Sequence, residues 1–284
     1  MPSFFHTLFS RINLLSLDVA AGAIACGSMV VCLLGVHMPS AWWLALPLSV
    51  WVIYTADHLM DAYRLKDKAH TARHLFHHQH FRFISLVAAI ALLFCLGWVP
   101  FHLPVRMVYF GLAMGAGVLI HLGLVSWIGD RISPFFHKEL GVGLIYTAGV
   151  WGGPLSLAGD ISAGIWFACA QFFLLVMFNL FLFSLYEIRS DEIDGHTSFV
   201  RAIGASAARK ALLGLGSGIV GLGILALKGA GDTQILLAVQ GVYAVMLAVL
   251  LAIAFLPHYF GRRARYRYWG DAIFILPILV WLMG

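Results

Sequence analysis

Charged residues are scarce in this chain of 284 residues. Asp, Glu, Lys and Arg together make up 11% of it, whereas hydrophobic residues make up 61%. A soluble globular protein has about 25% charged and about 45–50% apolar residues. So few charges cannot cover a surface that faces water, and the mean hydropathy of +0.90 agrees. The composition therefore excludes an ordinary soluble domain and predicts that much of the surface faces lipid.

Paired cysteines are also lacking. The four cysteines lie inside apolar runs without a Cys-x-x-Cys motif, which argues against disulfides and zinc sites. No basic stretch is followed by a short apolar stretch and a small-residue cleavage site, so we expect a short cytoplasmic arm in place of a removable signal peptide. The net charge of +5 comes from short loops between apolar runs, which favours membrane topology over nucleic-acid binding.

Long apolar runs recur along the whole chain and predict a single membrane domain, residues 1–284, with nine spans. About 20 apolar residues are needed to cross roughly 30 Å of hydrocarbon. The ninth run is short, and we expect its helix to begin near Tyr268. The expected spans are Leu14–Val36, Ala41–Asp61, Phe83–Val99, Val105–Val125, Leu140–Leu157, Ala163–Leu185, Ala211–Leu227, Ile235–Phe255 and Ala272–Met283.

Positive charge is distributed unequally between the two sides of this arrangement. Of the 18 lysines and arginines, 16 fall on one side, and only Arg106 and Lys228 fall on the other. Cytoplasmic loops carry the Lys and Arg excess, so we expect the N-terminus inside and, with an odd number of spans, the C-terminus outside. The 16 lie in the N-terminal arm and the loops 62–82, 126–139, 186–210 and 256–269.

A first acidic segment stands at the inner end of the second expected span. Asp57 and Asp61 are four residues apart, so they project from one helix face about 6 Å apart. Two like charges at this spacing destabilise a helix unless a cation or a basic group lies between them. Because Mg²⁺ takes carboxylate oxygens and shares them with substrate phosphates, the pair predicts a hard-cation site. The alternative is a solvated helix end.

A second acidic segment stands at the inner end of the sixth expected span. Glu187, Asp191 and Asp194 have i, i+4 and i+7 spacing and form one helical stripe. With Glu192 they make four of the 13 acids of the chain. Both segments lie on the same side of the membrane. Two stripes at equal depth can face each other across a cavity in the bundle and hold one or two divalent ions against a diphosphate.

Nine spans with acidic segments after the second and the sixth resemble the UbiA-type intramembrane prenyltransferase superfamily. Its first motif reads Asn-Asp-x-x-Asp-x-x-x-Asp. Asp57 and Asp61 align with the last two aspartates of this motif, whereas Ile53 and Tyr54 stand at its leading Asn-Asp. The first motif is therefore matched in part.

The second family motif reads Asp-x-x-Asp-x-x-x-Asp. Glu187 and Asp194 align with its first and last aspartates, and Ser190 stands at the middle one. Downstream, the segment from Thr197 to Gly204 is similar to the family's Thr-x-Pro-Val-x-x-x-Gly, with Phe199 in place of the proline.

The resemblance implies an all-α bundle in a bacterial inner membrane around a central cavity that opens to the cytoplasm. It also implies an enzyme in which Mg²⁺ held by the acids binds an isoprenyl diphosphate, and a lipophilic, aromatic acceptor traps the allylic cation. The implied catalytic residues and metal ligands are Asp57, Asp61, Glu187 and Asp194, with Asp191 as a further ligand. Basic groups and aromatic faces suit the leaving diphosphate and the cation. The implied substrate-binding residues are Tyr54, Arg64, Lys138, Tyr186, Arg189, Asp191 and Arg201.

Other interpretations stay open. The histidine run from His70 to His80 is consistent with a metal site, whereas the resemblance implies a cytoplasmic helix that covers the active site. Asp18, inside the first expected span, is a functional candidate by its location. The chain is alternatively a non-catalytic or differently catalytic isoprenoid- or quinone-binding relative, or a cation-coupled transporter. Transport is disfavoured because the acids cluster at one face and not near the midplane.

Overall fold

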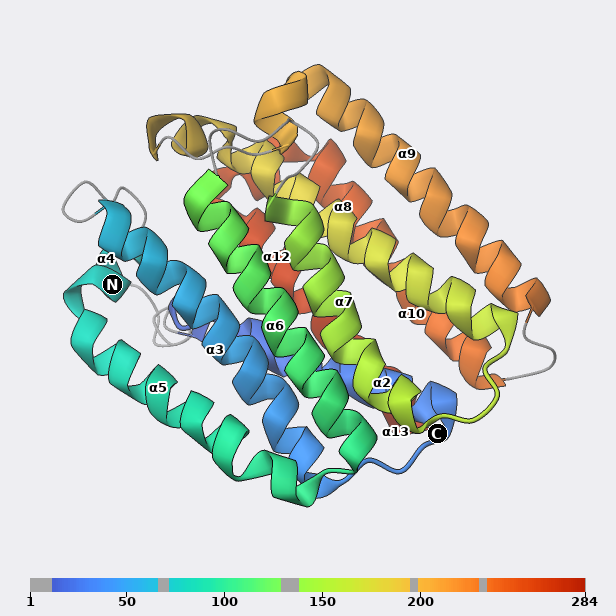
Figure 1. The fold of residues 1–284 in the computed structure, drawn as a ribbon. Helices are drawn as coiled ribbons and strands as arrows, with labels where there is room; N and C mark the ends of the chain where they lie inside the picture. The colour runs from blue at the N-terminus through green and yellow to red at the C-terminus, as the bar shows by residue number, and fades with distance from the viewer. Residues whose placement is uncertain (1–11, 66–71, 129–137, 195–198, 230–233, 284) are drawn as a thin grey trace.

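The computed structural model describes residues 12–65, 72–128, 138–194, 199–229 and 234–283. Within these ranges the regular elements are all helices and there is no strand, which confirms the all-α prediction. The long helices run alternately up and down in a tilted bundle (Figure 1). The ends of α3, α6 and α8 and the starts of α7 and α9 gather at one end of this bundle, which we call the acidic end because it holds both acidic segments.

The long helices are α2 (Leu17–Leu34), α3 (Ser40–Leu65), α5 (Phe81–Gly97), α6 (Val105–Ile128), α7 (Lys138–Leu157), α8 (Ala163–Asp194), α9 (Phe199–Gly229) and α10 (Gln234–Phe255). The short elements are α4 (Ala72–Gln79), η2 (Val99–His102), α11 (Pro257–Phe260), η3 (Arg262–Ala264), α12 (Arg265–Ala272), η4 (Ile273–Ile275) and α13 (Ile278–Met283). Helices therefore cover all nine segments that the apolar runs predict.

Among the described residues, six helices are long and apolar enough to cross a membrane, namely α2, α6, α7, α8, α9 and α10. They support the prediction of a polytopic membrane protein. The other three expected spans differ from these six. Helix α5 is apolar but has only 17 residues, α3 ends in a polar segment, and the C-terminal segment is divided among α12, η4 and α13. Helix length and composition thus establish six candidate spans where the sequence predicted nine.

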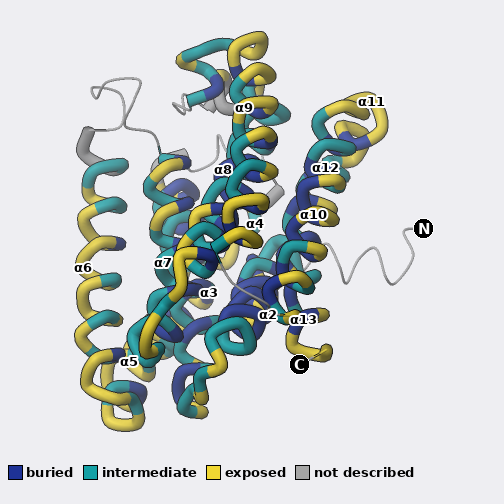
Figure 2. The backbone as a smooth tube through the Cα atoms, turned by 90° about the vertical axis from the view of Figure 1, so that its right-hand side faces the viewer, coloured by how far each residue is buried: buried dark blue, intermediate teal, exposed yellow. Residues whose placement is uncertain are grey.

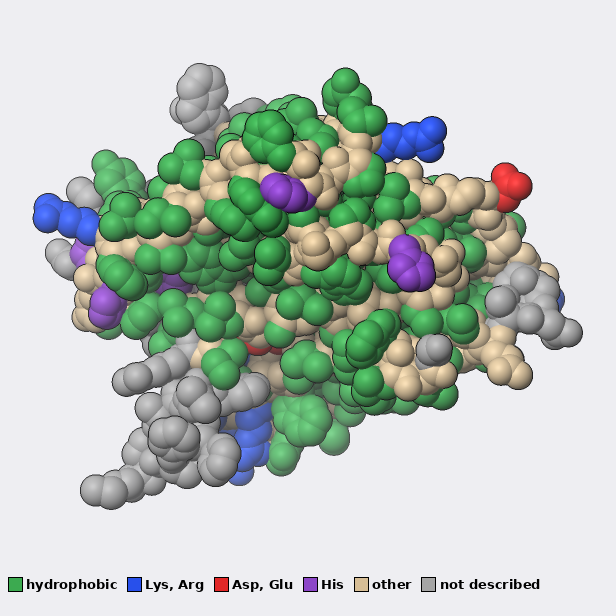
Figure 3. Space-filling view, turned by 90° about the horizontal axis from the view of Figure 1, so that it is seen from below, with side chains coloured by type: hydrophobic (Ala, Val, Ile, Leu, Met, Phe, Trp, Pro, Cys, Tyr) green, Lys and Arg blue, Asp and Glu red, His purple; other side chains and the backbone are tan. Residues whose placement is uncertain are grey.

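The interior and the periphery of the bundle differ in exposure (Figure 2). Helix α8 packs against α7, α9, α10 and α12, and Phe172, Leu175 and Phe178 on it are fully buried. Helices α5 and α6, in contrast, carry many exposed large apolar side chains. The space-filling view likewise shows a mainly hydrophobic surface with few charged side chains (Figure 3). An apolar surface of this extent suits contact with lipid.

A tryptophan between two glycines holds three helices together. The buried ring of Trp42 on α3 lies where side chains on Gly27 of α2 and Gly153 of α7 would stand. A Cβ at Gly27 would be 2.8 Å from Trp42 Cη2, and one at Gly153 would meet Trp42 Nε1. Small residues let membrane helices approach closely, and here they make room for an indole.

We predict that Gly153→Ala destabilises the protein by about 1–3 kcal/mol, the usual cost of overpacking, because the new methyl group would displace the Trp42 ring. The measurement is thermal or denaturant unfolding in detergent. Gly149→Ala, one turn earlier on α7, is the matched control because no atom lies within 4 Å of the added Cβ. Equal stability of the two variants would contradict the proposed packing role of Trp42.

Candidate functional site at the acidic end of the bundle

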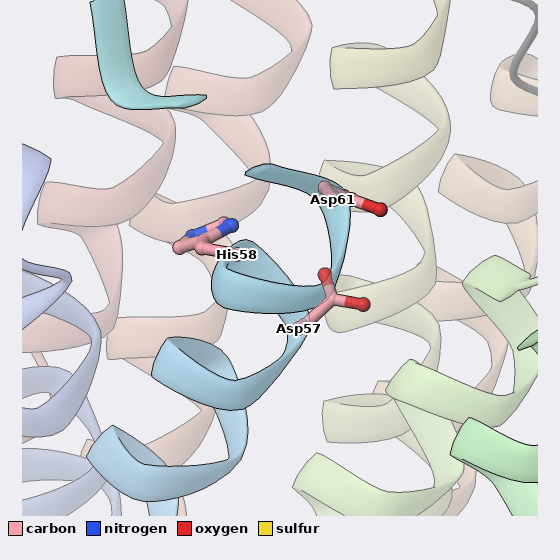
Figure 4. A group of neighbouring side chains, drawn as sticks. All are labelled: Asp57, His58 and Asp61. Carbon is pink, nitrogen blue, oxygen red and sulfur yellow. The ribbon is translucent and has the colours of Figure 1, made fainter. Parts of the chain in front are cut away.

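The first acidic segment forms the end of α3. Asp57 and Asp61 point to the same side of this helix (Figure 4), where they meet Lys138 of α7. Lys138 Nζ lies 2.8 Å from Asp57 Oδ2 and 3.8 Å from Asp61 Oδ2. The Lys138 side chain is 35% exposed, and those of Asp57 and Asp61 are 24% and 12% exposed. The basic group that the i, i+4 spacing calls for is therefore a lysine 81 residues away from Asp57 in the chain.

Glu139, the residue after Lys138, contacts α8 and α9 instead of α3. Glu139 is buried, and its Oε1 accepts hydrogen bonds from Ser184 Oγ of α8 at 2.8 Å and from Phe199 N of α9 at 3.2 Å. Its Oε2 is also buried and has no hydrogen-bond partner among the described residues. The first turn of α7 thus connects α3 on one side with α8 and α9 on the other. An acid suits this place because the helix dipole is positive at the N-terminus, whereas Lys138 depends on the α3 acids.

Glu139 was missed by the sequence analysis, which looked for acids repeated along one helix face. The available signal was a lone acid beside a lysine at the start of an apolar run.

The contact between Glu139 and Phe199 lies in the Thr197–Gly204 segment that resembles the family motif. Gly204 has φ 80° and ψ 157° inside α9, values that suit glycine, so the first turn of this helix bends away and its N-terminus meets Glu139.

His58 is buried on another side of α3. It points away from the two carboxylates in Figure 4, and its ring centroid lies 5.3 Å from that of buried His77 on α4. Helix α4 therefore packs over the end of α3, where the resemblance implies a covering helix. His80, by contrast, is exposed, and its ring packs on Phe76. His70 and the side chain of His74 lie outside the described residues.

Asp57, His58 and Asp61 can each offer one ligand atom within 4.8 Å of the others. Two ligand atoms on opposite sides of a Mg²⁺ ion are about 4.2 Å apart, twice the usual bond of about 2.1 Å. The two carboxylates suit this hard cation, whereas imidazole suits Zn²⁺, Cu²⁺, Fe²⁺ and Ni²⁺. Asp57 and Asp61 thus offer oxygen ligands of the kind that a hard divalent cation takes, and in this structure the Lys138 ammonium compensates their charge.

The second acidic segment has a different basic partner. Glu187 Oε1 lies 2.7 Å from Arg267 and accepts a hydrogen bond of 2.8 Å from the Tyr266 hydroxyl. Burial and the Glu187 carboxylate raise the pKa of Tyr266 above its ordinary value, so this hydroxyl stays protonated and donates. The Tyr186 ring stacks on Tyr266 with centroids 4.3 Å apart. Tyr266 and Arg267 were missed because their loop was interpreted only as cytoplasmic positive charge.

The other residues predicted for the site are distributed over α3, α8 and α9. Tyr54 lies on α3 with its ring centroid 6.4 Å from that of His58. Arg189 is exposed and Arg201 half-buried. The side chains of Arg64, Asp191 and Asp194 lie outside the described residues. The contacts of the described residues join the first acids to α7 and Glu187 to α12, and the first turn of α7 lies between α3 and α8.

Asp18 belongs to a third polar group. Asn13 Nδ2 donates to Asp18 Oδ2 at 2.6 Å and to Asp271 Oδ2 at 3.4 Å. Asp18 is buried on α2 and Asp271 lies on α12, so one amide connects two acids that are far apart in the chain. The group explains how an acid in the first expected span is accommodated.

Neither a family model, nor a curated protein, nor a solved structure matches this chain. The resemblance to UbiA-type prenyltransferases therefore depends on the motif and topology arguments alone.

We predict that Lys138→Met lowers the free energy of unfolding by about 1–2 kcal/mol. This is less than the 3–5 kcal/mol typical of a fully buried pair, because solvent screens the partly exposed Lys138. The Lys138→Met/Asp57→Asn double variant should recover part of the loss, since removing one carboxylate relieves the repulsion. The measurement is a double-mutant cycle by denaturant unfolding in detergent. Strictly additive losses would show that the two residues are not coupled.

Proposed function

We propose that this protein binds an isoprenyl diphosphate at the acidic end of the bundle and transfers the isoprenyl group to a lipophilic, aromatic acceptor in the membrane, as UbiA-type prenyltransferases do. One observation carries the proposal. Asp57, Asp61 and Lys138 meet where the mainly apolar helix α3 ends and the mainly apolar helix α7 begins, and all three are partly shielded from water. Carboxylates for a cation and an ammonium for phosphate oxygens are thus held in one place.

Asp57 and Asp61 would hold Mg²⁺, and Glu187, Asp191 and Asp194 would supply further carboxylates from α8. A bound Mg²⁺ would supply positive charge that stabilises the diphosphate as it leaves. With the carboxylates bound to that charge, Lys138 is free to donate to a diphosphate oxygen. In this proposal the Lys138–Asp57 ion pair keeps both groups compensated until the substrate separates them.

The transfer breaks the bond between the isoprenyl carbon and the diphosphate oxygen, and both electrons go to that oxygen. The acceptor then forms a bond to the allylic carbon and loses a proton. Tyr54 and Tyr186 are proposed to supply aromatic faces that would stabilise a passing cation. Arg64, Arg189 and Arg201 are proposed to bind the diphosphate with Lys138.

The proposed topology has nine spans, with α3, α5 and the C-terminal segment Ala272–Met283 added to the six long apolar helices. The acidic end faces the cytoplasm of a bacterial inner membrane, where the central cavity opens. The N-terminus lies inside and the C-terminus outside. The support for this orientation is the excess of lysine and arginine on the side of the acidic end.

A second candidate function is metal-independent binding of an isoprenoid or a quinone without transfer. The observation that favours it is the same ion pair. Lys138 already compensates the charge of Asp57 and Asp61, so these acids do not need a metal ion for stability. The two candidates differ in whether divalent cations are required for binding.

We predict that the purified protein binds farnesyl or geranylgeranyl diphosphate in the presence of Mg²⁺ and loses this binding in EDTA. Asp61→Asn should weaken binding by about 100-fold, or roughly 2.7 kcal/mol, because it removes a charge from the cation site. The measurement is equilibrium binding in detergent, followed by product analysis with a panel of aromatic acceptors.

Asp160→Asn is the matched control for this measurement, since Asp160 is an exposed acid between α7 and α8, at the opposite end of the bundle. It should bind like the wild type. Binding that is equally tight in EDTA and in Mg²⁺ would refute metal-dependent transfer and leave the isoprenoid-binding alternative.

A further inference from the structure

The connection from α10 to α12 is a basic surface. Between Gln234 and Gly270 the chain has four arginines and no acid or lysine. Arg267 is taken by Glu187. Arg262 and Arg263 are exposed, and neither makes an ion pair with a residue that the structure describes. Net positive charge therefore remains on this connection.

The third remaining arginine is held by an aromatic ring. The Arg265 guanidinium lies 4.5 Å from the centroid of the Tyr259 ring, which is 52% exposed. This is a cation–π distance, and Arg265 makes no ion pair with a carboxylate among the residues that the structure describes. The backbone at Arg263 and Ala264 has φ 55° and 51°, which is uncommon for residues other than glycine. This left-handed turn separates α11 from α12.

The apolar residues beside this turn indicate its depth relative to the membrane. Phe255 and Leu256, at the end of α10, are exposed, and so is Trp269 on α12. In Figure 2, α11 protrudes at the acidic end beyond α10 and α12 and is largely exposed. From the end of α10 into the turn that follows it, the exposed side chains thus change from Phe255 and Leu256 to Tyr259 and then to Arg262 and Arg263. This order matches hydrocarbon, interface and headgroup layers, because aromatic residues prefer the interface.

We propose that Arg262, Arg263 and Arg265 bind the headgroup phosphate of an anionic phospholipid in the adjacent leaflet. Guanidinium groups bind phosphate oxygens through two parallel hydrogen bonds, and basic clusters next to membrane helices are attracted to anionic lipids. The tail of the same lipid lies against Phe255 and Leu256. This site is separate from Asp57, Asp61 and Lys138 and does not depend on the proposed function.

The test is native mass spectrometry of the full chain in non-ionic detergent, titrated with phosphatidylglycerol or with phosphatidylcholine. Phosphatidylglycerol should bind more tightly. Arg262→Gln/Arg263→Gln should weaken its binding by about 25-fold, that is about fivefold for each arginine near a membrane surface. Arg262→Lys/Arg263→Lys should lose only part of the affinity, since it keeps the charge but not the paired hydrogen bonds.

Arg106→Gln/Lys228→Gln is the matched control, because it removes two exposed charges from the opposite end of the bundle, and it should bind phosphatidylglycerol like the wild type. Equal affinity for the two lipids, or a 262/263 variant that binds like the wild type, would overturn the proposal. So would inorganic diphosphate that binds the wild type as tightly as the lipid and is lost in the same variant, since the arginines would then form a site for soluble anions.

Discussion

Lys138 between Asp57 and Asp61 is the interaction on which the acidic end depends. Two carboxylates on neighbouring turns of a helix in an apolar bundle repel each other, and removing them from water costs free energy. The ammonium offsets both costs only if α7 begins at the level of these acids. The position of α7 is held in turn by Glu139, which binds α8 and α9. One charged turn therefore joins the helices that carry the two acidic segments.

The same principle recurs around this end of the bundle. Glu187 is compensated by Arg267 and Tyr266, and Asp18 shares Asn13 with Asp271. Both partners of Glu187 lie on another helix, α12, whereas Asn13 lies just before α2 in the chain and joins Asp18 to Asp271 on α12. A buried polar or charged group costs free energy unless it has a partner at hydrogen-bond distance. These acids consequently act as cross-links between helices as well as potential ligands.

The helices were largely predictable because hydrocarbon thickness imposes a length on every apolar run. The run Ile235–Phe255 matches α10 almost residue for residue. The ninth run was harder to predict, since the chain there is divided among α12, η4 and α13. The Asp57 and Asp61 spacing was readable for a related reason. Residues four apart share a helix face whatever surrounds them, and both side chains point the same way (Figure 4).

The sequence by itself determined the helical membrane class, the unequal distribution of charge and the direction of the acids on their helix. Each of these follows from local composition or from helical periodicity. Only the tertiary structure decided which basic residue meets which acid. In the sequence, Lys138 was a candidate for substrate binding and Arg267 was only a loop charge, yet one lies on Asp57 and the other on Glu187. The physical reason is that Lys138 and Asp57 are 81 residues apart in the chain. Their contact depends on how the helices pack, and local sequence patterns contain no information on that packing.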